Sequence, residues 1–240
     1  MYNKIKIITL LIILNCNLLA INNFKVAIDI GHTPKRSGAT SASGIKEYLF
    51  NKILAFELLY ALKDKGYYKS FIINEGGDEI KLINRAKIAN DKNADLFISI
   101  HHDSVQSKFL KRVTIDEVTY KYCNKFEGYS LFYSKKNRQK KKAITYAKLL
   151  ADKLMEYGLN PTLHHAQKIK GENREVLDKK RGIYQFANLV VLKKTNMPSI
   201  LLEAGIIVNT YEEEKLSNVE YRRVIILAII NSIEEYEKNK

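Results

Sequence analysis

The chain has 240 residues, a formal net charge of +14 and a hydrophobic content of 46%. This length and apolar content suit one domain with a sizeable core, and nothing in the sequence demands a second. The charge favours anionic polymers, among them those of a bacterial envelope. The basic residues are mostly scattered lysines without interleaved aromatic residues, so we expect no nucleic-acid partner.

Residues 1–20 differ in character from the rest of the chain. Lys4 and Lys6 precede an apolar run over residues 7–14, and Ala20 offers a small residue for cleavage. The pattern predicts a signal peptide, and hence a protein exported to the periplasm or cell envelope. Two alternatives remain open, a membrane anchor and a lipid on Cys16, although the run is shorter than the ~20 residues of a membrane span.

Removal of this leader leaves Cys123 as the single cysteine of the mature chain. We therefore expect no internal disulfide, and we interpret Cys123 as a structural thiol rather than a nucleophile. The mature chain, residues 21–240, is predicted to be a monomeric catalytic domain without a transmembrane span.

Apolar runs and helical periodicities alternate along this domain. The pattern predicts an α/β fold, a single domain whose mainly parallel twisted sheet carries helices on both faces. In the helix predicted over residues 79–90, Leu82, Ile83 and Ala86 are expected to face inward. Two regions, about 105–128 and 159–187, are interpreted as insertions, the second of them loop-like. Strands are expected at 24–30, 68–74, 95–100, 129–134, 189–192 and 198–203, with a short candidate at 111–118, and further helices from 47 to 65, from about 143 to 157 and over 222–237.

Histidines follow two of the apolar strands. His32 comes after the first, and His101 and His102 come after the strand LFISI, while Glu47 opens the first helix. Because parallel strands end at one edge of a sheet, these side chains predict a site for one Zn²⁺, held by His32, Glu47 and His101. Three such ligands leave a position free for water, as hydrolytic zinc sites require. The alternative is that His102, rather than His101, is the second histidine ligand.

A zinc hydrolase also needs a carboxylate that moves the proton of the attacking water. Glu203 is the candidate, because it stands in the apolar strand SILLEAG, which we expect to reach the same edge of the sheet. An unpaired buried carboxylate is costly, so a functional role is favoured over a structural one.

Five segments together resemble one known family, and the resemblance runs from about residue 25 to 233. The family is that of the zinc-dependent N-acetylmuramoyl-L-alanine amidases, the type-3 amidase group of bacterial cell-wall hydrolases. The segments are VAIDIGH (26–32), GIKEYLFN (44–51), LINRAKIAN (82–90), LFISIHHDS (96–104) and MPSILLEAGIIVN (197–209).

The resemblance implies that His32, Glu47 and His101 bind zinc and that Glu203 acts as general base and acid. It implies hydrolysis of the amide between the lactyl group of N-acetylmuramic acid and L-alanine of peptidoglycan, in cell-wall remodelling or cell separation. Some relatives keep their own site blocked until a partner releases it, so an activator protein is a candidate partner beside peptidoglycan.

Four further residues are candidates to support a ligand or to contact substrate. His102 and Asp103 follow His101 where many relatives have a small residue, and Arg85 matches a family arginine that has an ion pair as its equal explanation. His165, beside His164 in the second insertion, contacts substrate or belongs to an exposed polar loop.

Two rival functions stay open at this point. One is a zinc peptidase or deacetylase that acts on another envelope amide. The other is an envelope-binding protein without catalysis, against which the four intact residues His32, Glu47, His101 and Glu203 argue.

Overall fold

The computed structural model describes residues 23–239, so the predicted leader, with Cys16, lies outside the described residues. Among the residues described, no helix is long and apolar enough to cross a membrane. Cys123 is buried in a small apolar cluster with Val105, Ile206 and Val208.

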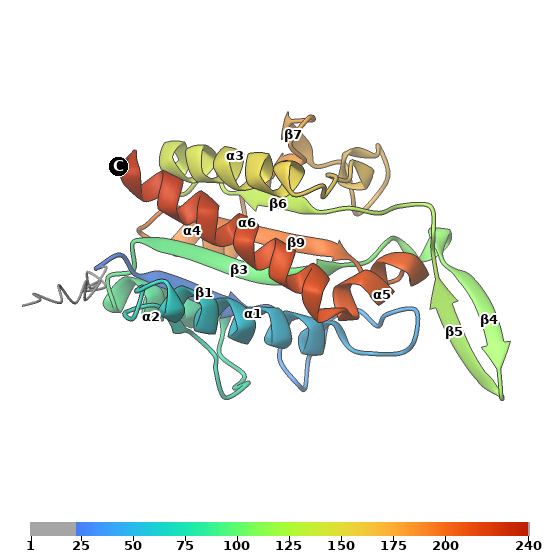
Figure 1. Ribbon diagram of the computed structural model, residues 1–240. Coiled ribbons are helices and arrows are strands. Elements are labelled where there is room, and N and C mark those ends of the chain that lie inside the picture. Colours follow the sequence, from blue (N-terminus) through green and yellow to red (C-terminus); the bar gives the residue numbers. More distant parts are fainter. Residues whose placement is uncertain (1–22, 240) are drawn as a thin grey trace, which may run out of the picture.

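A seven-stranded sheet forms the centre of the domain, in the order β2-β1-β3-β9-β6-β8-β7 (Figure 1). The strands β2, β1, β3 and β9 run parallel, β6 is antiparallel to β9 and parallel to β8, and β7 is antiparallel to β8. The predicted α/β fold with a mainly parallel sheet is confirmed. The strands are β1 (Val26–Ile30), β2 (Phe71–Ile72), β3 (Leu96–Asp103), β6 (Ser130–Tyr133), β7 (Glu175–Asp178), β8 (Ile183–Gln185) and β9 (Ser199–Ile206).

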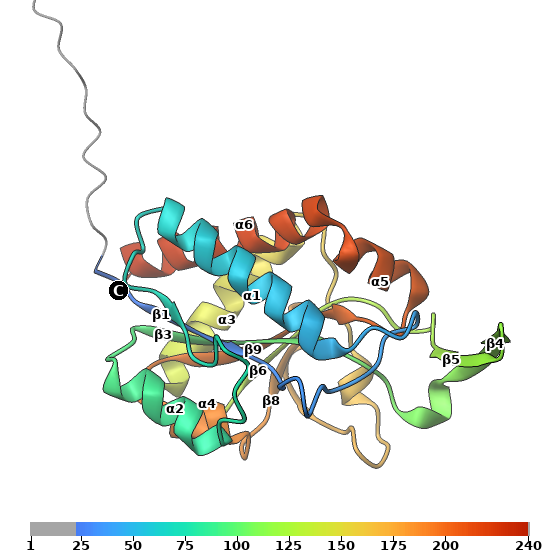
Figure 2. The same cartoon turned by 90° about the horizontal axis from the view of Figure 1, so that it is seen from below.

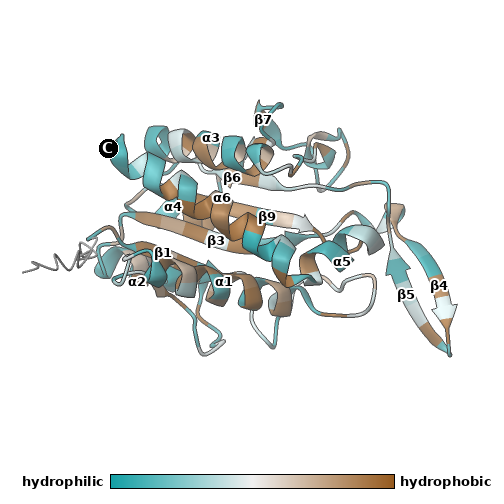
Figure 3. Cartoon of the chain, viewed as in Figure 1, coloured by the Kyte–Doolittle hydropathy of each residue, from teal (hydrophilic) through white to brown (hydrophobic). Residues whose placement is uncertain are grey.

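Helices cover both faces of this sheet (Figures 1 and 2). One face carries α1 (Glu47–Asp64), α3 (Lys140–Glu156) and α6 (Val219–Lys238), with α5 (Thr210–Ser217) leading into α6. The other face carries α2 (Leu82–Asp91) and α4 (Val190–Lys194). Alternate residues of each strand face opposite sides, so the sheet divides the apolar residues into two separate core clusters. Figure 3 shows the apolar colouring concentrated on β3, β9 and the helix sides toward them.

A β-hairpin projects from one end of the domain, within the first predicted insertion (Figure 1). Its strands are β4 (Lys111–Ile115) and β5 (Val118–Tyr122), so the short strand expected at 111–118 is in fact most of a hairpin. Asp116 and Glu117 form the turn with φ of 46° and 66°, a pair of left-handed residues that matches the twist of the two strands.

Three expectations about local structure are wrong. A strand was expected at residues 189–192, but residues 190–194 form the helix α4, whose Val191 and Leu192 pack in the core cluster with Ala89 of α2 and Phe97 of β3. The second insertion is not simply loop-like, since it supplies β7 and β8 to the sheet. Leu82 and Ile83 are exposed, at 48% and 45%, because α2 turns the smaller Ala86 and Ala89 toward the sheet.

Candidate metal centre and catalytic cleft

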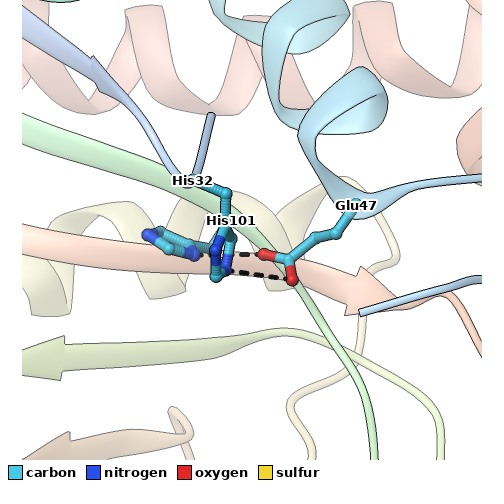
Figure 4. A group of neighbouring side chains, drawn as sticks. All are labelled: His32, Glu47 and His101. Carbon is cyan, nitrogen blue, oxygen red and sulfur yellow. Dashed lines mark hydrogen bonds and ion pairs between the residues drawn. The ribbon is translucent and has the colours of Figure 1, made fainter. Parts of the chain in front are cut away.

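The side chains of His32, Glu47 and His101 converge at the carboxyl ends of β1 and β3 (Figure 4). His32 Nε2 lies 3.1 Å from Glu47 Oε2, and His101 Nδ1 lies 3.1 Å from Glu47 Oε1. Each residue offers one donor atom to a set whose members lie within 4.8 Å of one another. Burial opposes ionisation of Glu47, but the hydrogen bonds and charges of His101 and His32 outweigh it and hold the pKa of this carboxyl well below its usual value.

The backbone around this set leaves room only for glycine at two positions. A Cβ on Gly31 would lie 2.5 Å from the ring of His101, and a Cβ on Gly38 would lie 2.2 Å from Glu47 Oε2. His32 itself has a φ of 66°, which turns its ring from the direction of β1 toward Glu47. The glycines therefore allow the loop after β1 to close around the three donors.

Asn51 connects the metal-ligand set to His102. Its Nδ2 donates to Glu47 Oε1 at 3.2 Å and to the carbonyl of Gly31 at 3.1 Å, so its Oδ1 accepts from His102 Nδ1, at 2.8 Å. Burial lowers the pKa of His102 to about 3, which keeps this ring neutral. His102 thus lies on the α1 side of β3, outside the metal-ligand set, and Asn51 links it to Glu47 by hydrogen bonds.

Arg85 is bonded to the loop that follows β1 and is not a free cation in the cleft. Its guanidinium pairs with Asp29 Oδ1 at 3.0 Å and donates to the carbonyl oxygens of Ile30, at 2.6 Å, and His32, at 3.0 Å. Asp29 also accepts from Ser99 on β3, at 2.8 Å. The ion-pair interpretation of Arg85 agrees with this geometry, and the contact with His32 makes the pair a support of the metal-ligand loop.

Glu203 stands on β9 directly opposite His101 on β3, and both line a cavity of about 390 Å³ with His32. The strand β9 continues to Ile206, so Glu203 lies within it rather than at its last position. Its Oε2 is buried without a hydrogen-bond partner. Burial, together with the charges of Asp103 and Glu47, raises the pKa of this carboxyl well above its usual value. A carboxyl in this state is suited to carrying a proton.

Asp103 and His165 lie across the same cavity. His165 Nε2 is 2.7 Å from Asp103 Oδ2, and His165 Nδ1 is 2.8 Å from Glu172 Oε2. Burial opposes protonation of this imidazole, but the two carboxylates outweigh it and raise the pKa of His165 to about 9. Residues from the second insertion therefore form one wall of the cleft instead of an exposed loop.

The donor chemistry of His32, Glu47 and His101 fits a zinc-type cation. Two imidazole nitrogens and a carboxylate are ligands that zinc commonly takes, and Asn51 and Arg85 supply the outer contacts that usually orient such ligands. An α/β domain that combines this donor set with a buried, unpartnered carboxyl in one cleft has the make-up of a metal-dependent hydrolase.

Comparisons with known proteins identify the family. Residues 26–235 match the family model described as N-acetylmuramoyl-L-alanine amidase. The chain is 28% identical over 212 residues to a putative N-acetylmuramoyl-L-alanine amidase of Buchnera aphidicola subsp. Baizongia pistaciae, an alignment that covers 88% of this chain and 95% of the relative. The chain therefore belongs to the N-acetylmuramoyl-L-alanine amidase family, as the resemblance of its motifs indicated.

Solved structures show the same fold. The catalytic domain of CwlV, the amidase of Paenibacillus polymyxa var. colistinus, matches with a TM-score of 0.66 and 26% identity over 90% of this chain and 99% of its own. The CwlD amidase of Clostridioides difficile, solved in complex with the GerS lipoprotein, matches with a TM-score of 0.68 and 21% identity over 91% of this chain and 100% of its own.

The structure thus brings His32, His101 and Glu203 into one cleft. Glu47 contacts both histidines, Arg85 bonds to the loop that carries His32, and His102 is linked to Glu47 through Asn51. Sequence reasoning missed one contributor, Asn51. Asn51 stands four residues after Glu47, on the same side of α1, and that spacing was a usable signal. His164 and His165 were both considered as substrate contacts or as an exposed loop, but no local pattern predicts their contact with Asp103, which is distant in sequence.

Proposed function

We propose that this chain is a zinc-dependent hydrolase of the amide bond between N-acetylmuramic acid and L-alanine of peptidoglycan, acting in cell-wall remodelling or cell separation. The observation that carries the proposal is the unpartnered carboxyl of Glu203, register-paired with His101 in the cavity that His32 also lines. Family membership supplies the bond that is cleaved.

In the proposed reaction, His32, Glu47 and His101 hold the cation. When bound, Zn²⁺ would polarise the scissile carbonyl and lower the pKa of a water molecule toward ~7. Glu203 takes the proton of the attacking water on its carboxylate and returns it to the departing amine of L-alanine. A pKa raised by burial suits the second half of this transfer, in which the carboxyl must donate.

Digestion of purified peptidoglycan, with and without chelator, tests the proposal. Mass analysis is expected to find free stem peptides that begin with an unblocked L-alanine amine and that disappear when chelator is present. Fragments cut at a peptide bond would instead support a peptidase, and glycan that has lost acetyl groups would support a deacetylase. Walls that bind the protein but stay intact would support the envelope-binding alternative.

The same proposal includes a location for the protein and an activating partner. Peptidoglycan lies outside the cytoplasm, so we place the protein in the periplasm or cell envelope, which cell fractionation tests. We also propose an activator in the envelope, on the analogy of CwlD with GerS, whose likeness to this chain supports the fold. Addition of envelope extract to the digestion is expected to increase peptide release.

A further inference from the structure

A second set of metal-type donors lies beside the first. Asp103 stands at the end of β3, and His164 and His165 form the short 3₁₀ helix η2 (His164–Ala166) in the second insertion. His165 Nε2 and His164 Nε2 approach the same oxygen, Asp103 Oδ2, at 2.7 and 3.2 Å. The donor atoms of these three residues lie within 4.8 Å of one another, and none of them belongs to the set of His32, Glu47 and His101.

The remaining nitrogen of each imidazole is already engaged. His164 Nδ1 lies 3.1 Å from Thr162 Oγ1, and His165 Nδ1 lies 2.8 Å from Glu172 Oε2, which belongs to a carboxylate that also accepts from Gln106 at 3.0 Å. Histidines that bind metal typically direct their other ring nitrogen to a carboxylate or another polar group, which fixes the orientation of the ring. This arrangement leaves both Nε2 atoms to meet at Asp103.

One nitrogen of this cluster, His164 Nε2, lacks a hydrogen-bond partner. His164 is 4% exposed, and its Nε2 is buried without a hydrogen bond, although it faces Asp103. The rings of His164 and His165 lie 3.9 Å apart, tilted by 37°, so they compete for one carboxylate oxygen. A buried polar atom without a partner costs roughly 1–3 kcal/mol. A cation between the three donors would take the place of the proton that His165 Nε2 shares with Asp103 Oδ2, and it would also give His164 Nε2 a partner.

We propose that Asp103, His164 and His165 bind a second divalent cation of the zinc type. Two imidazoles and a carboxylate are the same donor chemistry as in the first set, which favours zinc over calcium or magnesium. Asp103 and His165 line the cavity that also contains Glu203, so this ion lies at the wall of the same cleft. This second ion is additional to the proposed reaction, which needs only the ion held by His32, Glu47 and His101.

Such an ion would fasten the second insertion to the sheet. Its ligands would join the end of β3 to the second insertion, since His165 follows Asp103 by 62 residues in the chain. It would also place positive charge beside Asp103, Glu172 and Glu203, three carboxyl groups that the cleft brings together. The wall of the cleft formed by residues 164–174 would then depend on metal.

Metal content measured by mass spectrometry tests the proposal. The full-length protein is loaded with Zn²⁺, dialysed to constant content, and compared with His164→Ala, with His32→Ala and with the double variant. We expect two ions per chain in the wild type, one in each single variant and none in the double variant. Visible absorption of the Co²⁺-loaded proteins gives a second count, since each set contributes its own bands.

The comparison of wild type with His164→Ala decides the second site. One ion in the wild type that persists in His164→Ala would overturn the proposal, whatever the hydrolase assay shows. The His32→Ala variant decides the first site separately. Circular dichroism confirms folding, and Asp103→Asn and His165→Gln, which preserve side-chain size better, repeat the comparison if His164→Ala does not fold.

Discussion

His101 on β3 and Glu203 on β9 are directly opposite each other in the parallel ladder of the central sheet. Opposite residues in a parallel pair point to the same face, so the register of two strands places a metal-ligand candidate and a proton carrier side by side. The separation between the proposed cation and the proposed base is therefore fixed by backbone hydrogen bonds rather than by a loop.

Replacement of Glu203 by Gln is expected to abolish proton transfer while leaving the metal in place. The amide is nearly isosteric but cannot take up a proton, so kcat should fall by about 100- to 10,000-fold. The buried, unpartnered Oε2 carries no stabilising hydrogen bond in the native state, so thermal stability should be unchanged or higher. Peptide release, metal content and melting temperature measured together check this.

Glu214→Gln is the matched control, because Glu214 is exposed on α5, away from the cleft. It should leave all three quantities unchanged. Full activity in Glu203→Gln would rule out the assigned role.

Replacement of Gly38 by Ala is expected to impair metal binding. The new Cβ would lie 2.2 Å from Glu47 Oε2 and 2.6 Å from His32, and the φ of 73° adds backbone strain of roughly 1–2 kcal/mol. Zn²⁺ affinity should fall at least about tenfold, as for other disturbances of metal-ligand orientation. Competition with a chromogenic chelator measures the affinity.

Gly158→Ala separates strain from contact. Gly158 has a φ of 84°, yet a Cβ there would meet nothing within 4 Å. Gly38→Ala should lose at least as much stability as Gly158→Ala, because it adds a steric contact to the strain, and only Gly38→Ala should lose affinity. Equal affinities would show that the loop after β1 can adapt to a side chain at position 38.

Replacement of Asn51 by Ala is expected to weaken metal binding and the fold together. The change removes donors to Glu47 and Gly31 and leaves His102 Nδ1 without an acceptor, at a cost of about 1–3 kcal/mol in unfolding free energy. Because Asn51 orients Glu47, the affinity for Zn²⁺ should fall about 10- to 100-fold. Urea unfolding and metal titration measure the two effects.

Asn137→Ala provides the comparison for that variant. Asn137 is equally buried and donates to the carbonyls of Leu192 and Met197, at 2.7 and 3.2 Å, remote from the metal-ligand set. Asn137→Ala should lower the free energy of unfolding by a similar amount and leave the affinity for Zn²⁺ unchanged. If both variants lost affinity alike, the effect would come from general loosening and not from Glu47.

Glu212 on α5 predicts a pH dependence of stability. Its carboxylate accepts from the backbone N–H of Gly128 and Ile206, each at 2.9 Å, but burial outweighs these bonds and raises its pKa from 4.5 to about 7. Between pH 4.5 and 7 the folded chain keeps a proton that the unfolded chain has lost. The free energy of unfolding therefore falls as pH rises through that window, by at most ~3 kcal/mol from Glu212, and the contribution of Glu212 is constant above pH 7.

Glu212→Gln cannot ionise and should remove this slope. Urea unfolding of wild type and variant across the window, in chelator so that metal binding does not contribute, gives the difference in unfolding free energy at each pH. Glu214→Gln should follow the wild type. Parallel curves for wild type and Glu212→Gln would mean that Glu212 has an ordinary pKa.

Much of the fold was predictable because the central strands can be recognised from their apolar composition alone. The apolar runs that became β1, β3 and β9 are buried on both faces, so their patterns survive without knowledge of their neighbours. The same reasoning gave a wrong prediction for the run LVVL. A four-residue apolar segment fits a strand or a buried helix equally well, and its packing against α2 decides between them. The short strands β7, at the edge of the sheet, and β8, between β6 and β7, lack any such run.

The sequence by itself determined which residue types stand near the ends of β1 and β3, and the order of its motifs determined the family. Only the tertiary structure decided which of two adjacent histidines meets Glu47, because the alternation of β3 sends His101 and His102 to opposite faces of the sheet. It also decided that Asp103 meets His164 and His165, a contact between segments some sixty residues apart that depends on how the second insertion folds back over the cleft. Local composition carries strand and helix preference, whereas convergence of donors depends on register and packing, which are properties of the whole chain.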